Sequence, residues 1–537
     1  MIVSGRQRGR KMSERTMTWQ STYHWAEQKP DAEALVSAEQ RLTWAQTKQA
    51  VDRFAASLWA QGVRKGDRIA MMSAARPEFL IAMMATNRVG GIWLGINPKM
   101  TESEIQYLLE DSTPSVLIAA RMFAGSDQAE KIRSIRGMSA SLKHVFTIGE
   151  AFDDAISYDA ATSDSVDPSA LDALPPVSED DDAVILYTSG STGKPKGVVH
   201  THKSLVTNAA MECELFPIQG HSRLLLHFPI NHVAAVVEFG LAAIHGGACL
   251  VFMESFDPVA CLKMIETERI TMVGQIPAMF LLQFRTAEFS QTDFSSVERF
   301  IWAGAAAPRL MIDILGEIAA KVGARLVTGY GSTETAGFVT YTTQDETVDR
   351  LARSAGKMAP GWEMRIDAPV SARGDSPIGE VLVRGDFLFD RYWQNDEATR
   401  NAIDADGWFH TSDVGYLDER GYLYLTGRSS DMYKSGGENI FPREVEEVLE
   451  TDEGVLMSAV VPVPDDIFQE IGWAYVMPKG DRQLVEAELR AHCVAHLANY
   501  KVPKRIFVLP MLPMLPNGKI DKKSLQAQAL ATLEAAQ

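Results

Sequence analysis

The chain has 537 residues and a formal net charge of −18, and 46% of its residues are hydrophobic. One hydrophobic core rarely organises a chain of this length, so we expect two or more domains. The excess of acidic residues disfavours nonspecific binding to nucleic acid or to an anionic membrane, and a polyphosphate ligand would need locally concentrated positive charge.

The first residues are basic and lack the apolar run of a secretory signal. We therefore expect residues 1–20 to form an extension outside the folded domains, with Met12 as an alternative start. The apolar stretch 233–252 contains Glu238 and several glycines, which predicts a buried helix followed by a strand instead of a membrane span. The four cysteines show no CxxC pair, which favours reduced thiols and a cytoplasmic location.

Apolar segments alternate with helical patterns up to about residue 350. The predicted strands are 68–74, 114–120, 182–188, 247–253, 270–276 and 324–331, and the predicted helices include 77–91, 258–268 and 309–322. This alternation predicts an α/β fold of stacked, mostly parallel sheets covered by helices. The acidic, proline-bearing stretch 161–181 is typical of a surface linker.

The pattern changes after residue 355. Short strands at 379–385 and 421–428 with glycine-rich turns predict a β-rich subdomain. A polar joint then precedes an amphipathic helix that begins at Pro442. We expect three parts here: a large domain over 21–428, a hinge over 429–432 and a small, mobile α+β domain over 433–537.

The stretch "YTSGSTGKPKG" (187–197) follows directly on a predicted buried strand. Glycines allow backbone N–H groups to converge on an anion, and hydroxyls and lysines add donors and charge, so the loop should bind phosphate. It is not a Walker A loop, because Thr188 and Pro195 occupy the positions of the first glycine and the final Ser/Thr.

This loop resembles the signature loop of the adenylate-forming (AMP-binding) enzymes, which include acyl-CoA synthetases, luciferases and adenylation domains of nonribosomal synthetases. Further motifs follow in the order typical of that family, and the resemblance spans about residues 20–525. These motifs are "YGSTET" (330–335), "GWFHTSDVG" (407–415), "GRSSDMYKSGGENI" (427–440) and "PNGKIDKKSL" (516–525).

The resemblance implies a nucleotide site. Tyr330 would lie against the adenine, Glu334 would bind Mg²⁺, and Asp413 would accept hydrogen bonds from the ribose. The implied ATP- and AMP-binding residues are Thr188, Ser189, Gly190, Ser191, Thr192, Gly193, Lys196, Gly304, Ala305, Ala306, Gly329, Tyr330, Gly331, Ser332, Thr333, Asp413, Arg428 and Lys519.

The resemblance also implies the catalytic and thiol-side residues. Lys519 would be the catalytic lysine, acting with Thr333, Glu334 and His232, and Asp431 would be the hinge residue about which the small domain turns. The implied CoA-binding residues are Lys434, Ser435, Gly436, Gly437 and Glu438.

The acyl pocket is the least specific part of the resemblance. The implied lining is His232, Val233, Ala234, Gly274, Ala303, Gly329, Gly331, Ala336 and Gly337. Because these residues are mostly glycine and alanine, we expect room for an acid bulkier than acetate or benzoate. Aryl-alkanoic, arylpropenoic, medium- or long-chain and polycyclic acids all remain open.

The expected function is an ATP-dependent carboxylic acid–CoA ligase, with ATP and CoA as co-substrates and Mg²⁺ as cofactor. Loading of a carrier protein, luciferase-like oxidation and a catalytically inactive nucleotide-binding relative are the alternatives. The thiol side departs from the family pattern, since Gln469 stands where Asp-x-x-x-Gly-Glu has glycine. We expect small-molecule partners, no nucleic acid and no membrane span, and we leave a homodimer open.

Overall fold

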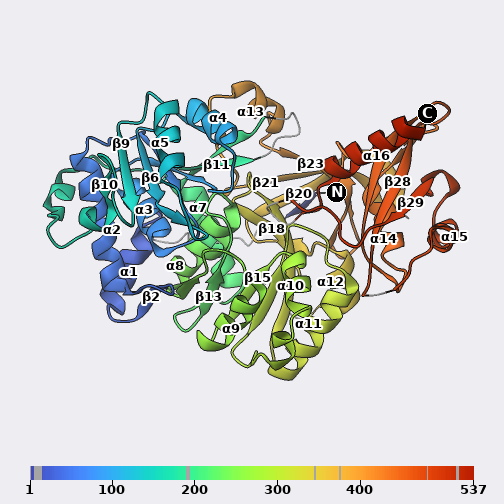
Figure 1. Cartoon of the computed structure of the whole chain (residues 1–537), viewed down its shortest axis with the longest axis horizontal. Coiled ribbons are helices and arrows are strands. Elements are labelled where there is room, and N and C mark those ends of the chain that lie inside the picture. Colours follow the sequence, from blue (N-terminus) through green and yellow to red (C-terminus); the bar gives the residue numbers. More distant parts are fainter. Residues whose placement is uncertain are drawn as a thin grey trace.

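The structure is a computed structural model that describes residues 2–4, 15–188, 194–343, 346–373, 376–480, 482–515 and 519–536. It is a mixed α/β protein with two large helix-covered sheets, one antiparallel sheet and a smaller C-terminal domain (Figure 1). The predicted fold class is confirmed.

The first large sheet has the strand order β10-β9-β6-β4-β5-β11-β12-β22. Its members from β10 to β11 run parallel to one another, whereas β12 and β22 are antiparallel additions at one edge. The strands are β4 (Arg68–Met72), β5 (Ile92–Ile96), β6 (Val116–Ala120), β9 (His144–Ile148), β10 (Ile156–Ser157), β11 (Asp182–Thr188), β12 (Lys196–Thr201) and β22 (Arg391–Tyr392). Helices of this part are α2 (Trp44–Ala60), α3 (Pro77–Arg88), α4 (Glu102–Ser112) and α5 (Ala129–Met138).

The second large sheet has the order β19-β18-β17-β16-β15-β13-β14-β2-β3. The strands are β2 (Glu33–Val36), β3 (Arg41–Thr43), β13 (Arg223–Leu226), β14 (Cys249–Phe252), β15 (Met272–Gln275), β16 (Arg299–Trp302), β17 (Arg325–Ser332), β18 (Gly337–Tyr341) and β19 (Lys357–Met358). Its helices are α1 (Gln20–Gln28), α7 (His202–Leu215), α8 (Ala242–Gly246), α9 (Pro258–Thr267), α10 (Pro277–Phe284), α11 (Arg309–Val322) and α12 (Val348–Arg353).

The antiparallel sheet has the order β1-β20-β21-β23-β24. Its strands are β1 (Ile2–Ser4), β20 (Trp362–Arg373), β21 (Ser376–Gly385), β23 (Phe409–Leu417) and β24 (Leu423–Arg428), and α13 (Asp396–Ala402) precedes β23. This sheet is the predicted β-rich subdomain.

The C-terminal domain, orange to red in Figure 1, has its own sheet in the order β26-β25-β28-β27, with β29 beside β28. Its elements are β25 (Tyr433–Ser435), β26 (Glu438–Ile440), α14 (Pro442–Leu449), β27 (Val455–Asp465), β28 (Gln469–Pro478), α15 (Glu486–His496), β29 (Arg505–Val508) and α16 (Lys522–Ala536). Residues 429–432 connect two different sheets, as the expected hinge requires.

Helix α3 is buried along almost its whole length, and this burial shows where it lies in the layered fold. Every residue from Pro77 to Asn87 is buried, including Glu78 and Asn87. A helix that is covered on all sides must lie between layers of structure and not on a surface. Its buried Asn87 is paired internally, since Nδ2 donates to the Ala183 carbonyl at 2.7 Å.

Two expectations about segments differ from the structure. Residues 161–181 connect β10 to β11, which are separated by four strands in the sheet, and Leu171 in the short helix Pro168–Ala173 is buried in the main core, so this largely exposed stretch is anchored to the folded domain and is not a free linker. At the N-terminus, Trp19 is buried and the Thr18 hydroxyl donates to Asn87 Oδ1 at 2.8 Å, so the folded domain already includes residues within 1–20.

The buried helix predicted within 233–252 begins as a π-helix, η2 (Ala234–Leu241), and continues as α8. Single-turn π-helical segments are rare and occur often at functional sites. The hydrophobic pattern could not reveal this feature, because the apolar residues around Glu238 are buried on every side of the helix.

Candidate active site

The glycine-rich loop closes an antiparallel hairpin. Thr188 at the end of β11 is opposite Lys196 at the start of β12. Because β11 runs parallel to β5, the loop begins at the carboxyl edge of the sheet, where α/β proteins bind ligands. The predicted phosphate-binding residues Ser189, Gly190, Ser191, Thr192 and Gly193 lie outside the described residues.

The described end of this hairpin contacts the predicted magnesium ligand. Lys196 Nζ lies 4.2 Å from the centre of the Tyr392 ring, and the Tyr392 hydroxyl donates to Glu334 Oε1 at 2.9 Å. Burial, followed by the neighbouring Glu334, raises the pKa of Tyr392, so the hydroxyl remains a donor at neutral pH. The structure thus brings together Lys196 and Glu334 through a tyrosine that the sequence motifs did not identify.

The backbone of the same motif is held by a buried histidine. His200 Nε2 lies 2.8 Å from the Thr333 carbonyl oxygen, and burial lowers the pKa of His200 to about 4. The ring is therefore neutral, and Nε2 carries the proton that it donates. Within the turn, the Ser332 N–H donates to Thr335 Oγ1 at 2.8 Å.

A second group of site residues joins the two kinds of sheet. The Tyr330 hydroxyl donates to Asp413 Oδ2 at 2.5 Å, and Arg428 Nε donates to Asp413 Oδ1 at 2.9 Å. Asp413 and Arg428 are opposite each other on β23 and β24, whereas Tyr330 comes from β17. Each carboxylate oxygen retains capacity to accept a further hydrogen bond, as binding of a ribose would need.

Lys519 of the C-terminal domain reaches this group. Burial lowers its pKa, with Arg428 lowering it further and Asp413 opposing the shift. Lys519 in turn helps to lower the pKa of His232 to about 4, after the larger effect of burial. Residues from both predicted domains therefore share one electrostatic environment, while the predicted turn Pro516–Gly518 before Lys519 lies outside the described residues.

His232 stands immediately before the π-helix. The Ala234 N–H donates to His232 Nδ1 at 3.1 Å, so the neutral ring carries its proton on Nε2. The side chain is solvent-accessible although its surroundings desolvate it, which is the combination expected for a residue lining a deep cleft. The neighbouring Val233 and Ala234 are buried.

The small residues 303–306 follow directly on β16. Trp302 is in register with Thr328 on the parallel strand β17, so the chain beyond both strands meets at one edge of the sheet. Ala303 is partly buried, and the exposed residues are Gly304, Ala305 and Ala306. Backbone at this edge can approach a flat base closely because no large side chain intervenes.

The glycines expected to leave room in the acyl pocket have close neighbours. A Cβ atom at Gly329 would lie 2.5 Å from the Thr340 carbonyl oxygen, and one at Gly331 would lie 2.0 Å from that of Gly337, because β17 and β18 pair tightly there. A Cβ atom at Gly274 would lie 2.1 Å from Cζ of Phe239, whose ring fills that space. The inference of open volume therefore does not hold at these three positions.

The predicted CoA segment forms a tight hairpin. Gly436 and Gly437 have φ values of 59° and 90° between the paired residues Ser435 and Glu438, as a two-residue hairpin turn with left-handed central residues requires. The Gly436 N–H donates to the Phe468 carbonyl at 2.9 Å, and the Lys434 N–H donates to Glu470 Oε2 at 3.1 Å. Turn geometry thus accounts locally for both glycines.

The expected hinge is an exposed turn. The Asp431 N–H donates to the Arg428 carbonyl at 3.1 Å, and residues 428–431 are all exposed. Arg428 ends β24, and Tyr433 begins the first strand of the C-terminal sheet. Torsion changes in this joint would therefore disturb little packed structure.

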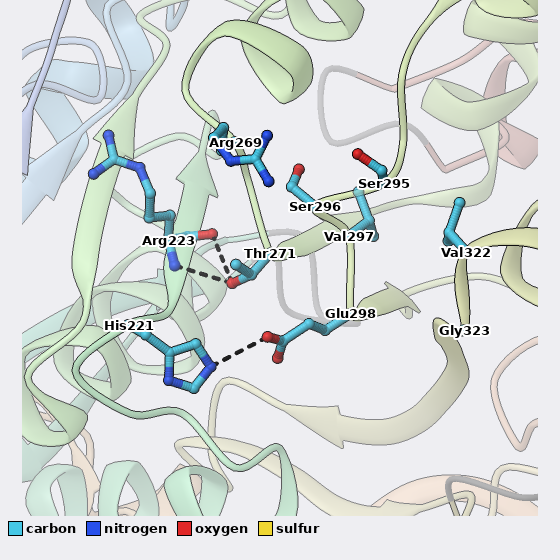
Figure 2. A pocket seen from close by; sticks show the side chains of 10 residues that line it. All are labelled: His221, Arg223, Arg269, Thr271, Ser295, Ser296, Val297, Glu298, Val322 and Gly323. Atoms are coloured by element: carbon cyan, nitrogen blue, oxygen red, sulfur yellow. Dashed lines mark hydrogen bonds and ion pairs between the residues drawn. The ribbon is translucent and has the colours of Figure 1, made fainter.

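A separate cavity of about 410 Å³ lies at the opposite edge of the second large sheet (Figure 2). It is formed where β13, β15, β16 and β17 begin, and in it His221 Nε2 lies 3.1 Å from Glu298 Oε1. The lining residues are His221, Arg223, Arg269, Thr271, Ser295, Ser296, Val297, Glu298, Val322 and Gly323. This cavity contains no residue of the predicted site, whose motifs follow the carboxyl ends of the strands.

The remaining expectations concern a membrane span and a metal site. None of the described helices has the length and apolar character needed to cross a membrane. The same residues contain no group of three or more His, Cys, Asp or Glu side chains arranged for a metal. A single carboxylate such as Glu334 still suits Mg²⁺, which usually takes one or two protein carboxylates and completes its shell with phosphate oxygens and water.

Comparison with known proteins agrees with this geometry. The sequence model of AMP-binding enzymes matches residues 22–393, and that of the AMP-binding enzyme C-terminal domain matches residues 444–519. The chain is 34% identical over 503 residues to the long-chain-fatty-acid–CoA ligase FadD13 of Mycobacterium tuberculosis, covering 93% of this chain and 95% of that protein. It is 32% identical over 502 residues to the feruloyl-CoA synthase of an Amycolatopsis species, covering 93% and 96%. The crystal structure of ATP-bound MatB from Rhodopseudomonas palustris has a TM-score of 0.84 and 27% identity, covering 96% of this chain and 98% of that one.

Proposed function

The chain belongs to the AMP-binding enzyme family and is an AMP-forming acyl-CoA synthetase, and we propose that its substrate is a carboxylic acid bulkier than acetate or benzoate, which it converts to a CoA thioester through an acyl-adenylate. The observation that carries this proposal is the shared electrostatic environment of Lys519, Asp413 and Arg428, which would connect the expected catalytic lysine to the expected ribose-binding pair.

In the first step, a carboxylate oxygen of the acid attacks the α-phosphorus of ATP. The bond from the α-phosphorus to the β-bridging oxygen breaks, and diphosphate leaves. Two anions approach each other in this step, so positive charge and hydrogen-bond donors are needed around the reacting phosphate. Lys519 and Arg428 would supply charge, and Asp413 would hold the ribose in place.

Magnesium would be held by Glu334, which Tyr392 orients from the side of the phosphate loop. When bound, the ion neutralises part of the phosphate charge. Lys196 lies against the same tyrosine ring, so it would stand beside the metal-bound phosphates. This arrangement places charge on the side of the leaving diphosphate.

In the second step, the sulfur of the CoA thiol attacks the acyl carbonyl carbon. The bond from that carbon to the AMP oxygen breaks, AMP leaves, and the thiol proton passes to solvent. Lys519 has no part in this step, and rotation about Asp431 would replace it by the segment 434–438, which includes the exposed residues Gly436 and Gly437.

The proposal of a bulky acid is supported by two relatives. It is not supported by open volume at the pocket glycines. The relatives are a long-chain-fatty-acid–CoA ligase and a feruloyl-CoA synthase, each similar to this chain over more than nine tenths of its length. Both acyl groups are larger than acetyl or benzoyl. Phe239, whose ring fills the space beside Gly274, is the side chain that would have to move for a long acyl group.

A panel of carboxylic acids tests the proposal, with AMP and diphosphate measured in the presence and absence of CoA. We expect AMP formation that depends on ATP, Mg²⁺ and CoA and is faster with aromatic or longer acids than with acetate. AMP formation that needs a phosphopantetheinyl carrier protein in place of CoA would overturn the choice of thiol. Preference for acetate would overturn the choice of acid.

A further inference from the structure

Three polar side chains converge on one point beside the predicted acyl pocket. A Cβ atom built on Gly337 would lie 2.8 Å from Asn208 Nδ2, 3.1 Å from Glu212 Oε1 and 3.2 Å from Glu238 Cγ. Asn208 and Glu212 are one turn apart on α7, and Glu238 comes from the π-helix η2, which packs against α7. Two carboxyl groups and an amide therefore surround the same small volume.

This group is buried and incompletely paired. Asn208 and Glu212 are both 0% exposed. Asn208 Nδ2 donates to the Ala336 carbonyl, and the Tyr341 hydroxyl lies 3.3 Å from Glu212 Oε1. Asn208 Oδ1 and Glu212 Oε2 are buried without a hydrogen-bond partner. Buried polar atoms are seldom left unpaired, so this pair of atoms points to a ligand group.

The charge state of the pair restricts what it can bind. Burial raises the pKa of Glu238 to about 8, and burial followed by the charge of Glu238 raises the pKa of Glu212 well above its usual value. Both carboxyl groups therefore hold their protons at neutral pH, and each can donate as well as accept. Among the described residues, no lysine or arginine is a partner of these three side chains, so the charge of an anionic group would not be compensated.

The group is close along the chain to two predicted parts of the site. Glu238 follows His232 by six residues, with His232 before η2 and Glu238 within it. Glu238 is partly exposed to solvent, whereas Asn208 and Glu212 are fully buried. Gly337 follows the predicted nucleotide motif Tyr330–Thr335 after one residue, Ala336, so the group lies next to the predicted adenylation site.

We propose that Glu212, Glu238 and Asn208 form a hydrogen-bonding end wall of the acyl pocket and select acids that carry an uncharged oxygen function, a hydroxyl or keto group, at a position distal to the reacting carboxylate. This inference rests on the proposed acyl-CoA synthetase function. A purely hydrocarbon acyl group of the same length would leave the buried donors and acceptors unpaired. A carboxylate at the same position would be rejected.

The alternative is that the three side chains only support the turn at Ala336, whose φ of 56° is left-handed and whose carbonyl accepts from Asn208. A structural role of this kind would affect stability and all acids equally. The test must therefore compare two acids in the same variant.

The experiment measures kcat/KM for AMP formation with matched pairs of acids, each pair differing only by a hydroxyl or keto group at the distal position. The wild-type protein should prefer the oxygenated acid by about tenfold or more, as a site built for hydrogen bonding discriminates. Glu238→Leu should abolish or reverse this preference, and Glu238→Gln should retain part of it. Glu214→Leu, on the exposed part of α7, is the matched control and should leave the ratio unchanged.

For variants that fold but have low activity, the preference between the two acids is measured by binding. Titration calorimetry with the two non-reactive acyl-sulfamoyl adenosines of a pair should show the same loss of preference in Glu238→Leu, with far-UV circular dichroism confirming the fold. Equal kcat/KM for the two acids in the wild type would overturn the inference while the synthetase function stood. Preference for an ammonium-bearing acid would also overturn it, and absence of AMP formation with every acid would overturn both.

Discussion

The Tyr392 hydroxyl donates a hydrogen bond to Glu334 Oε1 at 2.9 Å, while Lys196 Nζ lies 4.2 Å from the centre of the same ring. Tyr392 belongs to the two-residue strand β22, which pairs with β12 next to the phosphate loop. One side chain therefore connects the loop, the predicted magnesium ligand and the edge of the first sheet.

Replacement Tyr392→Phe should weaken the dependence on magnesium without removing the ring beneath Lys196. A hydrogen bond to a charged group contributes about 1.5–3 kcal/mol, so the Mg²⁺ concentration giving half-maximal AMP formation should rise about 10-fold or more. The measurement is a Mg²⁺ titration at saturating ATP. Tyr424→Phe, whose ring stacks on Tyr416, is the control, and equal titrations for the two variants would contradict the role of Tyr392.

Replacement Lys519→Ala should nearly abolish adenylation and spare thioester formation from supplied acyl-adenylate. The reason is that Lys519 interacts electrostatically with Arg428 and Asp413, and in the proposed mechanism it would face the charge that develops only in the first step. Each half-reaction is measured separately, with Lys523→Ala on the exposed side of α16 as the control. Equal losses in both half-reactions would refute the assignment.

Replacement Glu238→Gln should stabilise the protein in a pH-dependent way. The folded-state pKa of about 8 lies above the ordinary value of 4.5, so the carboxyl group contributes no penalty below about pH 4.5 and an increasing one up to pH 8. The gain should be absent near pH 4.5 and reach on the order of 1–3 kcal/mol at pH 8. Thermal unfolding of both proteins at the two pH values tests this, and the same gain at both would contradict burial as the cause.

Replacement Gln469→Gly should stabilise the C-terminal domain. Gln469 is exposed and has a φ of 69°, a left-handed conformation that costs a side-chain-bearing residue about 1 kcal/mol. Glycine relieves this strain, and the midpoint of thermal unfolding should rise by a few degrees. Gln106→Gly, in the middle of α4, should instead lower it, and a fall in both variants would show that strain at Gln469 is not relieved.

Regular elements could be predicted well because their signals are local. The strand 182–188 and the helix 309–322 agree with β11 and α11 at both ends, since apolar periodicity and glycine or proline boundaries lie within each segment. The polar composition of 161–181 predicts a linker and hides two buried residues, Ala161 and Leu171. Composition reports the average environment of a segment and not the contact of a single side chain.

By itself, the sequence determined the family motifs and the residues within them, including Tyr330, Asp413, Arg428 and Lys519, because each motif is contiguous. Only the tertiary structure decided which residues outside the motifs contact the motif residues. Tyr392 meets Glu334 across 58 positions, and Glu238 meets Gly337 from another element. The tertiary structure also explains two of the glycines. Gly329 and Gly331 allow β17 and β18 to pair closely, whereas the sequence suggested that they leave open pocket volume. Packing between distant segments is a property of three-dimensional distance, which no local pattern encodes.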